Sequence, residues 1–218
     1  MTAGGMPDFD AVILAGGKAA RMAGVDKPGL SVGGTAMLVL VARAAAVAGA
    51  KRLVIVGPDR PGAVRDGIFA IADRVPGGVV CVSEQPSGGG PVPAVRRGLA
   101  EVTADWLILL ASDMPFLESD HVSALVAGAV RSGSAGAVLA DDSQRPQWLA
   151  SAWRAGTLRT ALNAYAGDSL RQLLAPQDFV LIRLAASADG AAPWLDCDTP
   201  EDLAAAREAL SQAADNKP

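Results

Sequence analysis

Two cations that follow a glycine pair near the N-terminus are the residues of this chain best suited to chemistry. An apolar run ends at Leu14, the pair Gly16 and Gly17 comes next, and Arg21 and Lys27 follow. Backbone N–H groups freed by a glycine turn form a concave anion site, and the missing side chains let a phosphate approach closely. The guanidinium of Arg21 and the ammonium of Lys27 can then neutralise a polyphosphate. The spacing predicts a nucleotide-phosphate loop, with an ordinary turn between strand and helix as the alternative.

This loop differs from two common phosphate-binding patterns. No Gly-Lys-Ser/Thr closes it, as a Walker A loop would require. The residues after Gly17 are Lys18, Ala19, Ala20 and Arg21, so a G-x-G-x-x-G pattern is absent as well.

Two further segments of the chain carry carboxylates that could bind a metal ion. Trp106–Leu110 is a strand-like run that delivers Asp113 to its carboxyl end, where a hard oxygen ligand suits Mg²⁺ facing substrate phosphates. Asp196 and Asp198 alternate near the C-terminus, and a strand there would place both on one face. If these runs are neighbours, the carboxylates converge on one magnesium ion, or two. The alternatives are an Asp113 that caps a turn and an Asp198 that caps the following helix.

Two polar or glycine-rich segments offer further binding groups. Arg145 supplies a cation, and Gln144 and Gln147 supply amides, to a second substrate. An exposed hairpin tip explains the same residues equally well. The segment Ser87–Pro93 precedes a helix whose N-terminus would attract an anion or a base edge, or it is only a flexible loop.

The elements that must position these groups alternate between strand and helix. Short runs rich in Val, Ile and Leu predict buried strands, and apolar stripes predict helices. The strands are expected at 11–14, 52–56, 79–82, 106–110, 135–140, 149–153, 179–184 and 195–197, and the helices at 36–48, 92–102, 119–132, 157–166, 169–174 and 200–210. The predicted N-caps are Thr35, Ser119 and Thr199, the last within a capping box. This alternation predicts an α/β fold of the three-layer α/β/α, Rossmann-like type with a mostly parallel sheet, whose ligand crevice lies beyond the carboxyl ends of the strands.

Composition limits the number of domains and the classes of function. The chain has 218 residues, half of them hydrophobic, which is enough for one core and marginal for two. We therefore expect a single domain over 1–218, with frayed ends at about 1–8 and 212–218. A net charge of −4 argues against a nucleic-acid partner. Two distant cysteines and a single histidine argue against a disulfide framework, a zinc cluster or a histidine triad.

Targeting signals are also missing from the sequence. No run reaches the roughly 18 apolar residues of a membrane span, and the N-terminal segment lacks the pattern of a signal peptide. These observations predict a cytoplasmic protein that does not act on a membrane.

Taken in order, these motifs resemble the MobA-like molybdenum cofactor guanylyltransferase family of nucleotidyltransferases. The likeness runs from about Val12 to Leu203. Its segments are Leu14-Ala15-Gly16-Gly17, Arg21-Met22, Asp26-Lys27, Gly90-Pro91-Val92, Ser112–Leu117, Arg145-Pro146-Gln147 and Asp198–Leu203. The first loop and the aspartate motif are specific to the superfamily, and the other segments support them.

The resemblance implies a reaction in which the terminal phosphate of molybdopterin attacks the α-phosphate of GTP and pyrophosphate leaves. It implies that Leu14 to Gly17 hold the nucleotide, that Lys27 stabilises charge on the transferring centre, and that Asp113 carries the cofactor Mg²⁺. The expected roles are therefore catalytic for Arg21, Lys27 and Asp113, nucleotide-binding for Leu14, Ala15, Gly16, Gly17, Lys27 and Asp113, metal-binding for Asp113 and Asp198, and acceptor-binding for Arg145, Gln147 and Asp196. Proteins that deliver or receive the cofactor would be transient partners.

Departures from the family pattern leave the base and the acceptor open. Ala23 follows Arg21-Met22 where the family usually has glycine, and Gly57 and Gln85 replace an asparagine and an aspartate. Asp196-Cys197-Asp198 stands where guanylyltransferases typically have Asn-x-Asn, a form nearer to the cytidylyltransferases. A cytidylyltransferase of the molybdenum cofactor, or another NTP transferase with a different acceptor, is therefore the alternative. A catalytically silent nucleotide-binding module is a third reading.

Overall fold

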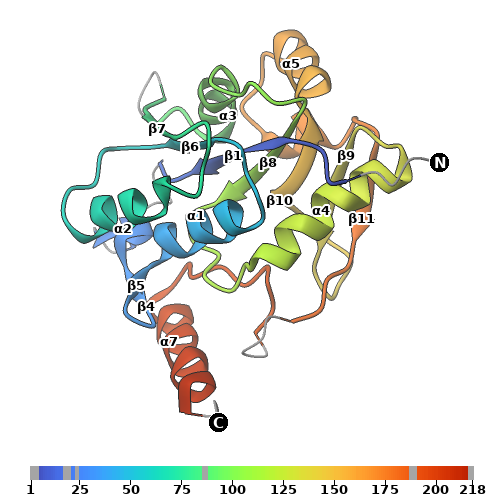
Figure 1. Cartoon of the computed structure of the whole chain (residues 1–218). Coiled ribbons are helices and arrows are strands. Elements are labelled where there is room, and N and C mark those ends of the chain that lie inside the picture. Colours follow the sequence, from blue (N-terminus) through green and yellow to red (C-terminus); the bar gives the residue numbers. More distant parts are fainter. Residues whose placement is uncertain (1–4, 17–20, 23–24, 85–87, 187–190, 216–218) are drawn as a thin grey trace.

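The fold is built on one seven-stranded sheet. A computed structural model describes residues 5–16, 21–22, 25–84, 88–186 and 191–215. The strands are β1 (Phe9–Leu14), β6 (Leu53–Val56), β7 (Val79–Val82), β8 (Trp106–Ala111), β9 (Gly136–Ala140), β10 (Pro146–Arg154) and β11 (Phe179–Ile182). They lie in the order β11-β9-β10-β8-β1-β6-β7 (Figure 1). Strand β10 is antiparallel to both of its neighbours and the other pairs are parallel, so the predicted mostly parallel sheet is confirmed.

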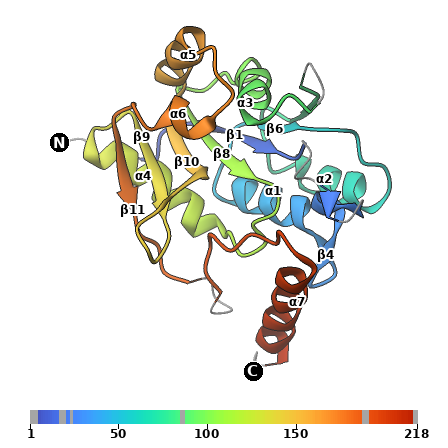
Figure 2. The same cartoon turned by 180° about the vertical axis from the view of Figure 1, so that it is seen from behind.

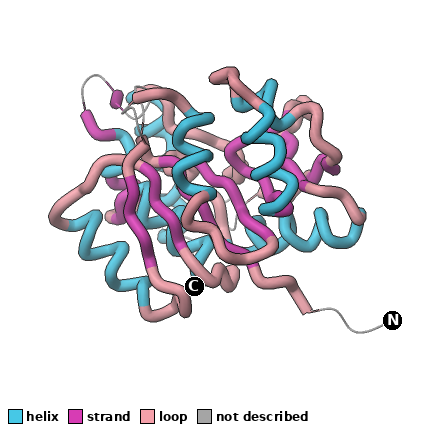
Figure 3. The backbone as a smooth tube through the Cα atoms, turned by 90° about the horizontal axis from the view of Figure 1, so that it is seen from above, coloured by secondary structure: helices cyan, strands magenta, loops and turns pink. Residues whose placement is uncertain are grey.

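Helices cover both faces of this sheet, as a three-layer α/β/α fold requires. They are α1 (Met37–Val47), α2 (Ala63–Ala72), α3 (Pro91–Leu99), α4 (Ser119–Ser132), α5 (Ala155–Ala164), α6 (Leu170–Leu174) and α7 (Pro200–Asp215). The buried residues of α1, α2 and α4 belong to one core cluster, and those of α3, α5 and α6 to another. Figures 1 and 2 show the two sets from opposite sides, and Figure 3 shows the strands running through the middle. Within the described residues, none of these helices combines the length and the apolar character needed to cross a membrane.

The two clusters explain why the central strands are continuous apolar runs. Ile13 of β1 packs in the cluster beneath α1, α2 and α4, whereas its neighbour Val12 packs in the cluster beneath α3. Successive side chains of a strand point to opposite faces, so a strand that is buried on both faces must be apolar at every position. The same alternation holds for Leu107 and Ile108 of β8.

The C-terminal helix packs beside the segment that follows β1. This segment forms two short ribbons, β2 (Arg21–Met22) with β3 (Val25–Asp26) and β4 (Ser31–Val32) with β5 (Thr35–Ala36), and a 3₁₀ turn, η2 (Lys27–Gly29), lies between them. Leu203 and Ala206 of α7 share a buried cluster with Val32. The guanidinium of Arg207 donates from Nε to the carbonyl oxygen of Ser31 at 3.0 Å. The chain just before α7 is thereby brought to the N-terminal loop.

Two predicted helix caps are wrong and one is confirmed. Thr35 lies in β5, and α1 begins without a side-chain cap. Helix α4 is capped by Glu118 instead of Ser119, because Glu118 and His121 satisfy each other's backbone N–H groups in a reciprocal capping box. At α7 the predicted capping box is present: the carboxylate of Asp202 accepts from the N–H and the hydroxyl of Thr199, each at 2.8 Å.

Three other local expectations differ from the structure. Residues 195–197 are not a strand; the N–H of Cys197 donates to the carbonyl oxygen of Asp113 at 3.2 Å instead. Strand β10 begins at Pro146 and carries a register shift between Gln147 and Ser151, so part of the expected polar loop belongs to the sheet. Helix α2 was not among the expected helices.

Helix α3 lies so close to the sheet that its contact with β1 has room only for glycine. A Cβ at Gly98 would stand 2.5 Å from Cγ1 of Val12 and 3.0 Å from Cγ2 of Val56. Both valines are buried and β-branched, and such side chains cannot rotate away without strain. Gly156 in α5 has open space around its position.

We expect Gly98→Ala to lower the free energy of unfolding by about 1–3 kcal/mol, because overpacking outweighs the better helix propensity of alanine. Gly156→Ala is the matched control and should leave stability unchanged or raise it by up to about 1 kcal/mol. Denaturant unfolding measures both. A Gly98→Ala protein as stable as the control variant would contradict the close packing of α3 on β1.

Candidate active site

A cavity of about 430 Å³ opens at the carboxyl ends of the parallel strands, beside the N-terminus of α3. Ligands of open α/β sheets bind at this edge. Its walls come from the ends of β1 and β8, from η2, and from the segments after β7 and before α3. The lining residues are Leu14, Gly16, Lys27, Pro28, Glu84, Gly88, Gly89, Gly90, Pro91, Ala94, Ala111, Ser112, Asp113 and Leu149.

Lys27 lies at the centre of the charged groups of this site. Its Nζ is 2.6 Å from Oδ2 of Asp113 and also donates a hydrogen bond to Oδ1 of Asp198. The Lys27 side chain is 2% exposed, whereas Asp113 is 21% and Asp198 62% exposed. The structure thus brings three of the predicted residues together, although 171 positions separate Lys27 from Asp198. Both carboxylates face the ammonium, so neither acts only as a cap.

Charge pairing determines the protonation of Lys27. Burial alone would lower its pKa, but the hydrogen bonds and charges of Asp113 and Asp198 outweigh burial and raise the pKa above its ordinary value. Lys27 therefore remains an ammonium at neutral pH. Because the folded pKa is the higher one, the pair stabilises the fold below the unfolded pKa, and this contribution is lost as pH rises through the folded pKa.

The pKa values of the two residues directly before Asp198 are raised. Asp196 is exposed at its surface, and desolvation by the neighbouring residues together with the charges of Asp198 and Asp113 raises its pKa. Burial raises the pKa of the Cys197 thiol to about 11, so this thiol is neutral at physiological pH. Cys197 is fully buried and its thiol is consequently neither a thiolate nucleophile nor a thiolate ligand.

Arg60 is a site residue that sequence reasoning missed. Its guanidinium makes a fork with Asp26, Nε to Oδ2 and Nη2 to Oδ1, each at 2.7 Å. Nη2 also donates to the carbonyl oxygen of Ala15 at 2.6 Å. Arg60 therefore joins the end of β1 to the residue that directly precedes Lys27. A single arginine in a loop, 34 positions from its partner, carries no local signal that could have revealed this role.

Two glycines allow the end of β1 to approach the loops beside it. A Cβ at Gly57 would lie 2.6 Å from the carbonyl oxygen of Ala15, and a Cβ at Gly16 would lie 2.9 Å from Oε2 of Glu84. Gly57, where the resemblance led us to expect asparagine, is thus required by the contact between the ends of β1 and β6. The remaining residue of the pair, Gly17, and the side chain of Arg21 lie outside the described residues.

The predicted acceptor residues do not all lie at the cavity. Nε2 of Gln147 donates to Asp141 at 3.1 Å, and the other oxygen of Asp141 accepts the N–H groups of Ser143 and Arg145. Arg145 and Gln147 are outside the cavity lining. Asp141 organises this segment as a turn, which agrees with the hairpin tip considered above. Asp196, in contrast, lies near enough to Asp113 and Asp198 to respond to their charges.

The carboxylates fit a magnesium ion that is bound together with substrate phosphates. Mg²⁺ is usually held by one or two carboxylates plus phosphate oxygens, with waters completing the octahedron. Asp113 and Asp198 supply two carboxylates that both pair with Nζ of Lys27 and so lie close together. Within the described ranges no group of three or more acidic, histidine or cysteine side chains could hold a metal by itself. The nucleotide would have to supply the remaining ligands.

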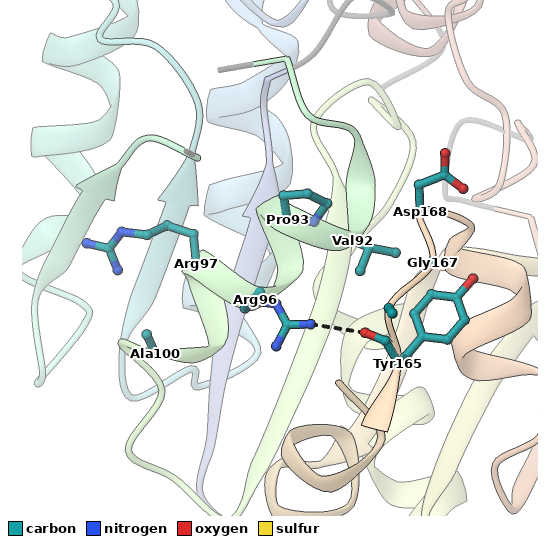
Figure 4. A pocket seen from close by; sticks show the side chains of 9 residues that line it. Val92, Pro93, Arg96, Arg97, Ala100, Tyr165, Gly167 and Asp168 are labelled. Atoms are coloured by element: carbon teal, nitrogen blue, oxygen red, sulfur yellow. Dashed lines mark hydrogen bonds between the residues drawn. The ribbon is translucent and has the colours of Figure 1, made fainter. Parts of the chain in front are cut away.

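A second hollow, of about 790 Å³, lies on the other side of α3. Figure 4 shows Arg96 reaching across it to Tyr165, with Arg97 directed away from Tyr165. Arg96 donates to the carbonyl oxygens of Leu162 at 2.7 Å and Tyr165 at 3.4 Å, and Arg97 pairs with Glu101 at 2.7 Å. These cations hold the C-terminal end of α5 and their own helix, so the hollow is less suited to an anionic ligand than the first cavity.

The strand ends of this Rossmann-like sheet carry a glycine-lined cavity, a buried lysine and paired carboxylates. This is the arrangement of a nucleotidyltransferase. The model of the MobA-like NTP transferase domain matches residues 11–184. The chain belongs to the MobA-like NTP transferase family and is a nucleotidyltransferase.

Individual relatives agree with this assignment. The chain is 31% identical over 207 residues to a molybdenum cofactor guanylyltransferase of Rhodobacter capsulatus, covering 93% of this chain and 97% of the relative. A solved nucleotidyl transferase from Methanothermobacter has a TM-score of 0.73 at 18% identity, over 96% of this chain and 99% of that one. A molybdopterin-guanine dinucleotide biosynthesis protein A from Archaeoglobus fulgidus has a TM-score of 0.67 at 16% identity, over 93% and 99%. These two structures support the fold alone.

We expect Arg60→Met to lower the free energy of unfolding by about 1–3 kcal/mol, because it leaves Asp26 and the carbonyl oxygen of Ala15 without their charged donor. Arg65→Met is the control, since the pair of Arg65 with Asp59 is largely exposed and should add nothing measurable. Urea unfolding of both variants tests this. Equal stabilities of the two variants would show that the Arg60 fork does not hold the loop.

Proposed function

We propose that this protein transfers GMP from GTP to molybdopterin and releases pyrophosphate. The observation that carries the proposal is the placement of Lys27, between Asp113 and Asp198, at the edge of the sheet where nucleotides bind. Membership of the MobA-like family supports the reaction type. Relatives that carry the name molybdenum cofactor guanylyltransferase support GTP as donor and the molybdenum cofactor as the destination of the nucleotide.

The proposed chemistry depends on charge and position, without a protein nucleophile. The attacking group is a phosphate of the acceptor, and the bond that breaks joins the α- and β-phosphates of GTP. Negative charge increases on the oxygens of the transferring centre and of the leaving pyrophosphate, and a fixed cation in a water-poor site stabilises such charge strongly. Lys27 is an ammonium at neutral pH and is nearly inaccessible to solvent, which suits it to this role.

Magnesium is the cofactor that we infer for this reaction. When bound, Mg²⁺ would neutralise charge on the triphosphate and help the pyrophosphate to leave. Asp113 and Asp198 are the residues that would hold it. Both carboxylates pair with Lys27, so the lysine holds them close to each other.

We also propose that the protein acts in the cytoplasm. Its cysteines Cys81 and Cys197 are free, and free thiols are typical of a reducing compartment.

The test measures the release of pyrophosphate from each NTP in turn, with molybdopterin as the acceptor and with Mg²⁺ present. We expect turnover with GTP, and we expect Lys27→Met and Asp113→Asn to reduce it by about 10²-fold or more while circular dichroism shows a retained fold. The matched controls Lys51→Met and Asp73→Asn change charges outside the cavity lining and should keep full turnover.

Each unfavourable result of this assay has a distinct meaning. Turnover with CTP in place of GTP would support the cytidylyltransferase. Release of pyrophosphate from no NTP would support a catalytically silent module. Full activity of the Lys27→Met and Asp113→Asn variants would show that these residues are not part of the active site.

A further inference from the structure

Strand β10 carries a bulge at the edge of the cavity. Gln147 pairs with Leu139 of β9, and Ser151 pairs with Val138, the residue of β9 adjacent to Leu139. Three residues of β10 are therefore inserted between these two pairs, and Leu149 is the middle one. An insertion of this kind bends the strand and redirects a side chain, and such bulges are over-represented beside active sites. The side chain of Leu149 lines the cavity.

Two side chains of β10 hold the bulge in one shape. The hydroxyl of Ser151 donates to the carbonyl oxygen of Trp148 at 2.7 Å and accepts the indole N–H of Trp153 at 2.8 Å. Ser151 and Trp153 are fully buried, so loss of this hydroxyl would leave the indole N–H without a partner. The ring of Trp148 packs edge-on against Phe179 of β11, with 5.5 Å between the ring centroids. The backbone of Leu149 is thus fixed by its neighbours.

Leu149 and the glycine-lined wall of the cavity lie on opposite sides of the β8 end. Strand β8, which Asp113 follows, lies between β10 and β1 (Figure 2). Gly16 follows β1, and the glycines at 88–90 precede α3, which packs on β1 and β6. Leu149 belongs to β10, on the other side of β8. The cavity therefore offers close backbone contact on one side of Asp113 and an apolar side chain on the other.

We propose that the bulge in β10 forms the acceptor subsite, in which Leu149 contacts the uncharged body of the acceptor and Ser151 is the positioning residue. This inference rests on the proposed function, in which two substrates must be bound at once. The nucleotide takes the glycine-lined side, because backbone without side chains lets its phosphates approach closely. The acceptor is then left with the side on which Leu149 lies.

The chemistry of the wall determines which part of the acceptor lies against it. The attacking phosphate of the acceptor must reach the α-phosphate of GTP near Lys27 and Asp113. Leu149 offers neither charge nor hydrogen bonds, and placing a charged group against an apolar side chain is unfavourable. The uncharged part of the acceptor that carries this phosphate therefore packs on Leu149 and excludes water from the contact.

The first test is the affinity of Leu149→Ala for molybdopterin and for GTP, each titrated alone by calorimetry with Mg²⁺ present. We expect molybdopterin to bind about tenfold more weakly than to the wild-type protein, because most of an apolar contact is lost. GTP should bind within about twofold of the wild-type affinity. Leu181→Ala is the matched control: it shortens a partly exposed leucine of β11 outside the cavity lining and should change neither affinity.

The second test is Ser151→Ala, which touches no substrate but releases the bulge. We expect its affinity for molybdopterin to fall by about threefold or more and its affinity for GTP to stay unchanged. A purely structural role would not separate the two substrates, so the difference between their affinities is the readout. Ser151→Ala with wild-type affinity for both would overturn the positioning role.

The outcomes separate this inference from the proposed function. Molybdopterin affinity that is unchanged in Leu149→Ala, or GTP affinity that falls in its place, would overturn the acceptor subsite and leave the proposed reaction standing. If molybdopterin binding depends on Leu149 but no GMP is transferred to it, the proposed reaction is wrong and the subsite stands. A wild-type protein that does not bind molybdopterin would overturn both.

Discussion

The contact of Lys27 with Asp113 and Asp198 is the interaction on which the arrangement of the site depends. A buried ammonium is unfavourable unless it is paired, and these carboxylates come from two distant parts of the chain. The pair therefore fixes the N-terminal loop, the end of β8 and the segment before α7 at one point. The same three groups have the charges that nucleotidyl transfer requires, so the contact that orders the site also prepares its chemistry.

The surrounding fold holds this contact from two sides. On one side, Arg60 binds Asp26 and the carbonyl oxygen of Ala15, which fixes the chain immediately before Lys27. On the other side, the capping box at Thr199 starts α7 directly after Asp198. Because α7 packs on β4 through Leu203, the short segment with Asp198 has little freedom to move away from the lysine. The site is thus positioned by loops that a rigid parallel sheet anchors.

The fold and the centre of the site could be predicted from sequence because their signals are local. Buried strands such as Trp106–Leu110 are visible as apolar runs. Asp113 follows that run at the carboxyl end of the strand, which is the edge of an α/β sheet where ligands bind. The capping box at Thr199 is likewise recognisable from residues that are close in the sequence.

The features that sequence did not reveal depend on contacts between distant residues. The fork of Arg60 with Asp26, the buried oxygen of Glu84 and the cap of α4 by Glu118 and His121 become visible only when the packing is known. The segment at Cys197 was expected to be a strand, but its N–H donates to the carbonyl oxygen of Asp113 at the edge of the site instead of entering the sheet. Asp198 still reaches the predicted place, by a different backbone path. Arg145 and Gln147 were expected to bind the acceptor, but they lie outside the cavity lining, and the amide of Gln147, in β10, donates to Asp141.

The most direct test of the central contact is a double-mutant cycle in which Lys27→Met, Asp113→Asn and the double variant are unfolded in denaturant. If the buried ammonium and the carboxylate stabilise each other, the two substitutions are non-additive, with a coupling energy of at least about 1 kcal/mol. Additivity within about 0.3–0.5 kcal/mol would contradict the interaction from which this site is built.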